Sequence, residues 1–173
     1  MNGAEPEVTV EIREARPDER PAAAAIAVAA FAQLGAHLAP DEREKLYARV
    51  RATTEAPDPG HVIVAVAGGR VVGSVVYNGP AAGQHPLFAA DWAFFRSIGV
   101  DAAWGGRGIG RRLVEACIER ARRDGAAWLG LYAADVNTVA VRLYRAMGFA
   151  EIGPAPSYWG VTYRVYGHDL SGG

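Results

Sequence analysis

A cluster of glycines joins a strand to a helix near the middle of the chain, and this junction constrains the fold more than any other feature. Residues 92–100 are apolar and rich in aromatics, which predicts a strand. Residues 105–110 contain four glycines, and a helix with apolar residues at every fourth position is predicted over residues 108–123. Glycines let a backbone approach a ligand closely, and the free N–H groups of a helix N-terminus attract anions. The junction therefore predicts a site for a pyrophosphate.

This glycine pattern differs from two common nucleotide-binding motifs. A P-loop needs Gly-Lys followed by Ser or Thr, and no such sequence is present at the junction. The dinucleotide pattern Gly-x-Gly-x-x-Gly needs a glycine where this chain has Arg111 or Leu113. The junction therefore matches neither the P-loop nor the dinucleotide fingerprint.

The remaining segments alternate between strands and helices in a mixed order. Gly68-Gly69 separates two apolar runs, residues 61–67 and 70–77, which predicts an antiparallel hairpin. Further strands are predicted at residues 8–13, 128–132, 149–152 and 161–170, further helices at 17–31, 38–56 and 137–147, and a loop at 153–156. This order predicts an α/β (mixed α+β) domain with a central mixed, mostly antiparallel sheet and helices on both faces.

The composition fits one folded domain and excludes several classes of protein. Of 173 residues, 50% are hydrophobic and 21% charged, so we expect one domain over residues 1–173 with an ordered core of about 8–170. A formal net charge of −1 gives no general attraction for nucleic acid or an anionic membrane. Cys117 and four scattered histidines predict no disulfide and no metal site, and they favour the cytoplasm. The sequence leaves open whether two copies of the chain form a homodimer.

At the glycine junction the chain resembles the GNAT superfamily of acyl-CoA N-acyltransferases. In that family a strand ending in apolar-x-Val-Asp runs into Arg/Gln-x-x-Gly-x-Gly/Ala. Here Ile98-Gly99-Val100-Asp101 runs into Gly105-Gly106-Arg107-Gly108-Ile109-Gly110. Gly105 stands where the family has Arg or Gln, and Arg107, Arg111 or Arg112 can compensate for it. A second block, residues 129–149, is similar to the family's strand, Asn, Leu-Tyr and Gly-Phe sequence.

The resemblance implies that acetyl-CoA lies in a splay between two central strands, at residues 98–100 and 129–132. The implied cofactor-binding residues are Ile98, Gly99, Val100, Gly105, Gly106, Arg107, Gly108, Ile109, Gly110, Arg111, Asn137 and Tyr144. The implied reaction is direct attack of an amine on acetyl-CoA, with the Tyr144 hydroxyl acting on the leaving thiolate. Two structural roles compete with these: Asn137 can be only a helix N-cap, and Tyr144 can be only a packed aromatic.

The sequence contains fewer motifs that indicate where the acceptor amine binds. Asp91 and His85 are the candidates for a general base, although neither matches a motif and both positions are typical of solvated loops. We expect the acceptor site among residues 31–50, 78–91 and 154–160, whose aromatics and lack of a dense acidic cluster favour a modestly apolar amine of a small molecule. Two alternatives stay open: a protein or peptide N-acetyltransferase, and a non-catalytic acyl-CoA-binding regulatory domain.

Overall fold

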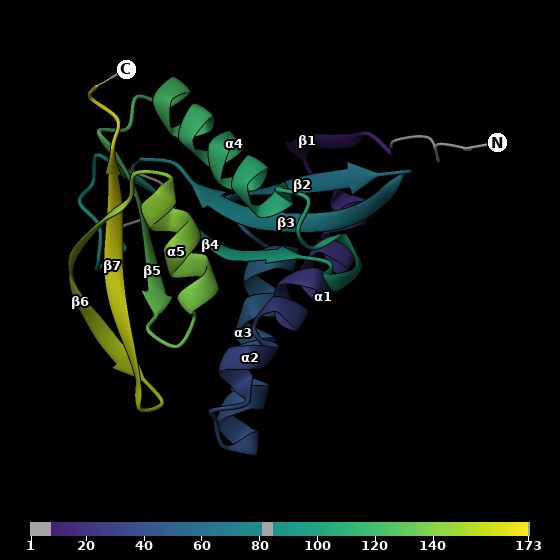
Figure 1. The fold of residues 1–173 in the computed structure, drawn as a ribbon, viewed down its shortest axis with the longest axis horizontal. Helices are drawn as coiled ribbons and strands as arrows, with labels where there is room; N and C mark the ends of the chain where they lie inside the picture. Colours follow the sequence, from purple (N-terminus) through teal and green to yellow (C-terminus); the bar gives the residue numbers. More distant parts are fainter. Residues whose placement is uncertain (1–7, 81–84, 173) are drawn as a thin grey trace.

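A seven-stranded sheet with the order β1-β2-β3-β4-β5-β7-β6 forms the centre of the computed structural model, which describes residues 8–80 and 85–172 (Figure 1). Its strands are β1 (Val10–Glu14), β2 (His61–Ala67), β3 (Arg70–Asn78), β4 (Trp92–Val100), β5 (Trp128–Ala134), β6 (Ala150–Tyr158) and β7 (Val161–Asp169). All neighbouring strands pair antiparallel except β4 and β5, which are parallel. The prediction of a mixed, mostly antiparallel sheet is confirmed.

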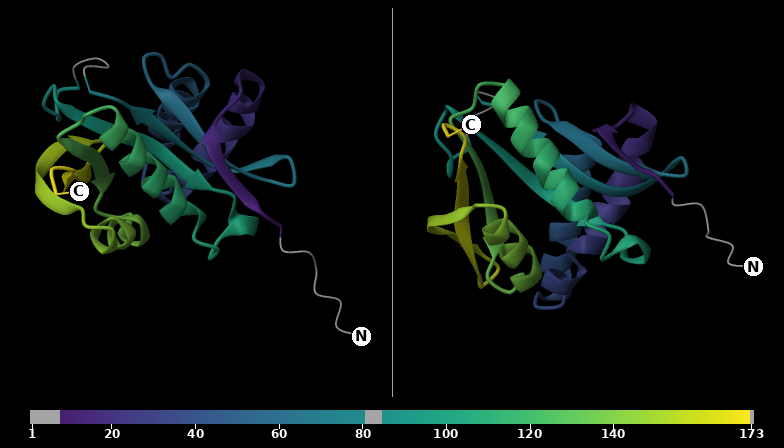
Figure 2. Two further views of the ribbon diagram at one scale, coloured as in Figure 1. Left: turned by 90° about the horizontal axis from the view of Figure 1, so that it is seen from above. Right: turned by 45° about the horizontal axis from the view of Figure 1, so that its top comes forward.

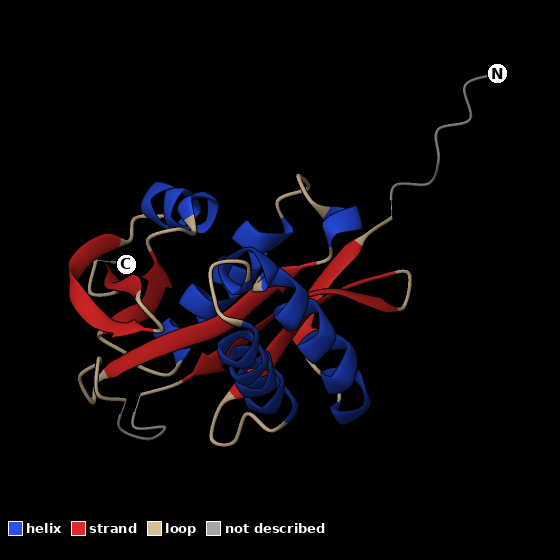
Figure 3. Ribbon diagram, turned by 90° about the horizontal axis from the view of Figure 1, so that it is seen from below, coloured by secondary structure: helices blue, strands red, loops and turns tan. Residues whose placement is uncertain are grey.

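Helices cover both faces of this sheet, as predicted (Figures 2 and 3). The helices are α1 (Arg20–Ala30), α2 (Ala32–Gly35), α3 (Pro40–Glu55), α4 (Ile109–Arg123) and α5 (Thr138–Ala146), with short 3-10 turns at Pro17–Glu19 and Ala102–Trp104. One core lies between the sheet and α4 with α5, and two smaller clusters lie between the sheet and α1 with α3. The predicted four-residue repeat is the buried face of α4, where Leu113, Cys117 and Ala121 are fully buried.

The sheet has two arms that separate between β4 and β5, and β4 has a bulge near this point. Val75 of β3 lies opposite two residues of β4, Ser97 and Ile98, and Ser97 adopts the left-handed conformation with φ +55°. The parallel ladder between β4 and β5 has three residue pairs and ends at Phe94 and Gly130. Beyond these pairs the two strands diverge, as Figure 1 shows, so the predicted splay between the central strands is confirmed.

The C-terminal edge of the sheet differs from the prediction. The segment Gly153-Pro154-Ala155-Pro156 was expected to be a loop, but it lies inside β6. Prolines cannot donate to a strand ladder, yet β6 is an edge strand, where outward positions need no partner. Two register shifts in the β6–β7 pairing accommodate the irregular segment. The loop prediction was therefore wrong because it took proline as a strand breaker without knowing that the strand is at an edge.

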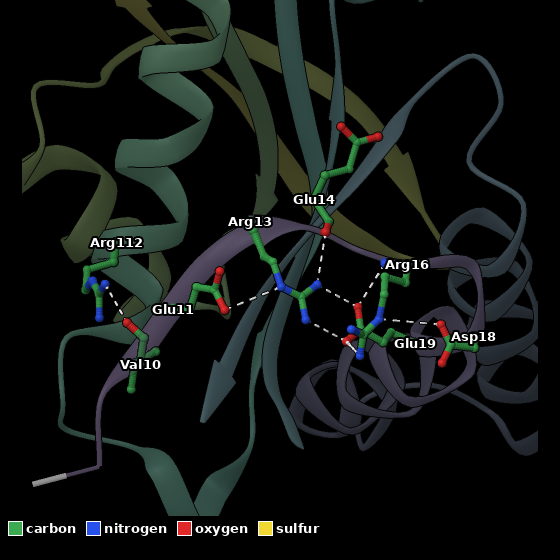
Figure 4. A network of polar contacts seen from close by, with 8 residues as sticks. All are labelled: Val10, Glu11, Arg13, Glu14, Arg16, Asp18, Glu19 and Arg112. Carbon is green, nitrogen blue, oxygen red and sulfur yellow. Dashed lines mark hydrogen bonds and ion pairs between the residues drawn. The ribbon is translucent and has the colours of Figure 1, made fainter. Parts of the chain in front are cut away.

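Charged side chains fix β1 against both helical layers (Figure 4). Glu19 is 8% exposed and accepts two hydrogen bonds of 2.8 Å from the Arg13 guanidinium, and Arg16 donates to it as well. The hydrogen bonds from Arg13 lower the pKa of Glu19 to about 2, so the carboxylate stays charged in the fold. On the other face, Arg112 of α4 donates a 2.8 Å hydrogen bond to the Val10 carbonyl oxygen.

Candidate active site

A cavity of about 130 Å³ lies where β4 and β5 diverge. Its wall includes Phe95 to Ile98 of β4, Leu131 to Ala134 of β5, and Asn137 and Tyr144 around α5. The rest of the wall comes from α1, α2, α3 and the β6–β7 hairpin, including Phe31, Leu34, Leu46, Arg49, Val50, Tyr158, Trp159 and Tyr163. Two of the three segments expected to form the acceptor site, residues 31–50 and 154–160, contribute to this cavity. Residues 78–80 and 85–91 of the third segment do not line it, and residues 81–84 lie outside the described residues.

Tyr144 lies on the cavity wall from the α5 side. Its ring packs against Phe95 and Phe149, with centroid distances of 5.7 and 6.0 Å, and the residue is 3% exposed. Burial raises the pKa of the Tyr144 phenol well above its ordinary value. The hydroxyl therefore keeps its proton at neutral pH and can donate it in a hydrogen bond to a group bound in the cavity.

Asn137 combines both roles that its position in the sequence allows. It is the N-cap of α5, where its Oδ1 accepts a 3.4 Å hydrogen bond from the Ala140 N–H. The same residue is part of the cavity wall. The structure thus brings Asn137 and Tyr144 to one cavity, at the two ends of a nine-residue helix.

The glycine loop at the start of α4 has the geometry that an anion site requires. Gly108 is the N-cap and has φ +75°, and Gly106 has φ +73°. A Cβ atom built at either glycine would meet no atom within 4 Å, so the space in front of the loop is open. The first N–H groups of α4 have no partner inside the helix, because no turn precedes them. A pyrophosphate fits this combination of free donors and open space.

Three arginines near the loop were candidates to compensate for Gly105, and the structure separates them. Arg107 lies over the Trp104 ring, with its Cζ 4.7 Å from the ring centroid, and Arg111 is exposed in the first turn of α4. Arg112 points the other way and donates to the Val10 carbonyl oxygen (Figure 4). Arg107 and Arg111 thus flank the loop, whereas Arg112 belongs to the β1 contact.

Several other residues of the predicted cofactor set also have packing roles. A Cβ at Gly99 would lie 2.8 Å from the Ala30 Cβ and 2.9 Å from the Ile26 carbonyl oxygen, so this glycine permits close contact between β4 and α1. Val100 packs against the α4 core, and Ile109 is 2% exposed within it. These contacts leave their backbone groups, and the side chain of Ile98 on the cavity wall, as the parts that can contact a ligand.

The structure does not bring either candidate base to the cavity wall. Asp91 is exposed and precedes β4, six residues and about 20 Å along the strand from Ser97. His85 packs against Phe94 and Tyr132, at centroid distances of 4.9 and 5.5 Å. Burial, with a contribution from nearby Arg96, lowers the pKa of His85, and its Nδ1 accepts a hydrogen bond from the Leu87 N–H. His85 is therefore neutral, and the nitrogen able to take a proton already accepts a hydrogen bond.

The cavity wall also contains residues that were not predicted from the sequence. Arg49 of α3 and Arg96 of β4 are both on the cavity wall, together with Tyr132 and Tyr163. Among the described residues, this wall contains no Asp, Glu or His. A signal for Arg96 was available, since it is a charged residue within the otherwise apolar strand 92–100, but Arg49 resembles any solvated helix residue.

Comparison with known proteins identifies the family of this chain and several relatives. The model of the acetyltransferase (GNAT) family matches residues 21–149. The N-alpha-acetyltransferase RimI of Mycobacterium tuberculosis is 38% identical over 110 residues, 63% of this chain and 61% of that protein. A mycothiol acetyltransferase of Nocardiopsis dassonvillei is 45% identical over 53 residues, 31% of this chain and 16% of that protein. Both matches therefore span less than two thirds of the relative's own length.

A solved structure matches over nearly the whole chain. The GCN5-related N-acetyltransferase from Kribbella flavida is 27% identical, with a TM-score of 0.70, and the match covers 96% of this chain and 100% of that one. Within residues 8–80 and 85–172, no helix is long and apolar enough to cross a membrane, and no group of three or more His, Cys, Asp or Glu side chains could hold a metal ion.

Proposed function

This chain belongs to the acetyltransferase (GNAT) family, and we propose that it transfers an acetyl group from acetyl-CoA directly to the primary amine of a small molecule. One observation carries the proposal: the cavity between β4 and β5 has the Tyr144 phenol on its wall and opens where both strands have lost their mutual pairing. A donor thioester and an acceptor amine can meet there without crossing the core.

Acetyl-CoA is the acyl donor that the family uses, and the described residues offer it a complementary surface. Its pyrophosphate would bind to the N–H groups at Gly108 and the first turn of α4, with Arg107 and Arg111 beside them. Its pantetheine amides would pair with the backbone edges of β4 and β5 beyond Phe94 and Gly130, where the ladder ends. Asn137, at the cavity wall, is available to the same arm.

In the transfer step the free amine attacks the thioester carbonyl carbon. The new C–N bond forms, the C–S bond breaks, and the electron pair of that bond goes to the sulfur. The Tyr144 hydroxyl donates a hydrogen bond to the departing thiolate, and a proton that it then passes to the sulfur is replaced from solvent. Because burial raises the pKa of this phenol, its main contribution is the hydrogen bond that it donates to the sulfur as negative charge develops there. The nitrogen loses its extra proton to water.

No carboxylate or imidazole on the described cavity wall is available to remove the proton of an incoming ammonium ion. The tyrosines are unsuitable, since burial raises the pKa of Tyr132, and raises that of Tyr163 to about 12. Two guanidinium groups and an apolar wall instead disfavour the ammonium form of a bound amine. We therefore propose that the amine enters as the free base, with its proton lost to solvent before attack.

The relative named RimI favours a second candidate, acetylation of a protein N-terminus. The cavity is small, and the β6–β7 hairpin with Tyr158 and Trp159 borders it, which favours a small acceptor over a long peptide. A panel of small amines and short peptides should be incubated with acetyl-CoA, with free thiol followed in time and products identified by mass. Faster transfer to peptide N-termini than to every small amine would replace the small-molecule proposal. Acetyl-CoA binding without transfer to any amine would favour the regulatory domain.

A further inference from the structure

Two arginines without acidic partners distinguish the acceptor side of the cavity from the donor side. Arg49 reaches the cavity from α3 and Arg96 from β4, and they are the charged side chains among its described lining residues. Neither forms an ion pair with any described residue. Many exposed arginines of the fold also lack an ion pair, but Arg13, which is partly buried as Arg96 is, has its charge neutralised by Glu19. An unneutralised pair of guanidiniums beside an apolar cavity therefore needs an explanation.

Arg96 is the more constrained of the two. It is half-buried, its guanidinium lies over the Phe94 ring at 5.9 Å, and its Nε is buried and donates to no described residue. Burial lowers the pKa of Arg96, and the positive charge of Arg49 contributes to the same direction. A buried donor with no partner destabilises the fold, because it has lost its hydrogen bonds to water without replacing them. An anionic ligand would remove that cost.

Arg49 occupies the mouth of the same cavity. Arg49 is exposed, and its Cζ lies 5.8 Å from the ring centroid of Tyr158 on the β6–β7 hairpin. Arg49 and Arg96 also act together on the pKa of Tyr132. The two guanidiniums thus face a common space from opposite elements, and a carboxylate is the group that planar guanidinium donors match best.

We infer that the acceptor is a primary amine that also carries a carboxylate, with the carboxylate held by Arg49 and Arg96 and the amine directed toward the donor side at Tyr144. This inference rests on the proposed acetyl transfer. The arrangement also sets orientation: the guanidiniums bind the carboxylate end, so the uncharged amine at the other end is turned toward the thioester. Polyamines, which have no anionic end, would be poor acceptors.

The test compares ω-amino acids of increasing chain length with the corresponding carboxamides, because removing that charge changes the pKa of a distant amine little. For the best chain length, we expect kcat/KM to be about 10- to 100-fold higher for the acid than for the amide, the value of a charged hydrogen bond. Arg96→Gln should reduce this ratio about tenfold or more, and Arg49→Gln should reduce it less because Arg49 is exposed. The double variant should abolish it.

Arg51→Gln is the matched control, because Arg51 is exposed on α3 and does not belong to the cavity wall. It should keep the acid-to-amide ratio, and all variants should keep the KM for acetyl-CoA. If Arg96→Gln does not fold, Arg49→Gln on the exposed helix position still tests the inference. An unchanged ratio in Arg49→Gln and in the double variant, or a wild-type preference for amides, would overturn it.

Two further measurements distinguish a carboxylate from a phosphate-like group, and failure of this inference from failure of the proposed function. A wild-type preference for aminoalkyl phosphonates over ω-amino acids would replace the carboxylate by a phosphate-like group and overturn the class that we infer. If the wild-type protein acetylates no amine at all, the proposed function itself fails. If it acetylates amines without preferring acids, the proposed function stands and only this inference fails.

Discussion

The donor and acceptor sides of the cavity are built in different ways. On the donor side, the glycine loop, the first turn of α4 and the Asn137–Tyr144 helix come from two short stretches of sequence, and their cavity-lining residues carry no charge. On the acceptor side, α1, α2, α3, β4, β5 and a hairpin each contribute a few residues. Its two arginines, Arg49 and Arg96, are 47 positions apart in the sequence and line the same cavity. If the proposed function holds, local motifs encode donor binding, whereas tertiary assembly encodes acceptor choice.

The proposed difference between the two sides fails if the glycine loop does not bind the donor. Gly108→Val places a branched side chain in the open space where the pyrophosphate is expected, so acetyl-CoA binding should weaken at least about 100-fold, or about 2.7 kcal/mol. Calorimetric titration measures the change.

Gly125→Val is the matched control for this substitution. Gly125 has φ +74° and open space around its Cβ, like Gly108, but it lies at the other end of α4. Both variants should lose a similar amount of stability, about 1–3 kcal/mol, from the left-handed conformation. Equal effects of the two substitutions on acetyl-CoA affinity would show that the loop is not a phosphate site.

The second test concerns Tyr144, where the donor side meets the chemistry. Tyr144→Phe should lower kcat by about 10²- to 10⁴-fold, because it removes the proposed donor to the thiolate. Acetyl-CoA binding should change little, since the ring contacts with Phe95 and Phe149 stay. Tyr166→Phe, a buried tyrosine that is not on the cavity wall, is the control and should keep kcat. An unchanged kcat in Tyr144→Phe would reduce Tyr144 to packing.

The same contrast explains what the sequence could predict. Hydrophobic periodicity and glycine spacing are local signals, so β4, α4 and the hairpin at Gly68-Gly69 were predicted to within one residue at each end. The acceptor side depends on which distant side chains converge, and no spacing reveals that Arg49 and Arg96 share a cavity. The chain has 18 basic residues, and most of these are ordinary surface charges. The bulge at Ser97 was likewise missed, because serine rarely adopts φ > 0 and gives no turn signal inside a strand.

Gly99 tests whether a motif residue serves packing and not the ligand. Gly99→Ala would place a Cβ against the α1 backbone and Ala30, so we expect a loss of about 1–3 kcal/mol in the free energy of unfolding. Gly153→Ala, whose Cβ would meet no atom within 4 Å, is the control and should cost less. Denaturant unfolding of both variants provides the measurement. Wild-type stability with weakened acetyl-CoA affinity in Gly99→Ala would assign this glycine to the donor site instead.

Glu19 lies outside the cavity and tests how the helices of the acceptor side are held in place. It precedes α1 and accepts hydrogen bonds from Arg13 of β1 (Figure 4). Its pKa is lowered from 4.5 to about 2 in the fold, chiefly by Arg13. Its stabilisation is therefore complete above about pH 4.5 and is lost as the pH falls toward 2. Glu19→Gln should lose about 1.5–3 kcal/mol at pH 7, the value of hydrogen bonds to a charged group, and show a flatter dependence of stability on pH between these values. Exposed Glu44→Gln should retain the wild-type pH dependence.

Asp91 should give the smallest effect of all. It lies beyond the paired end of β4 and β5, so an amine in the cavity cannot reach its carboxylate. If the amine loses its proton to solvent, kcat/KM should rise about tenfold per pH unit below the amine pKa of about 10.4. Asp91→Asn should keep this slope and stay within about twofold of the wild type, as surface substitutions do. A flattened acidic limb in Asp91→Asn would restore a carboxylate base, and it would require the acceptor to bind outside the cavity between the two arms of the sheet.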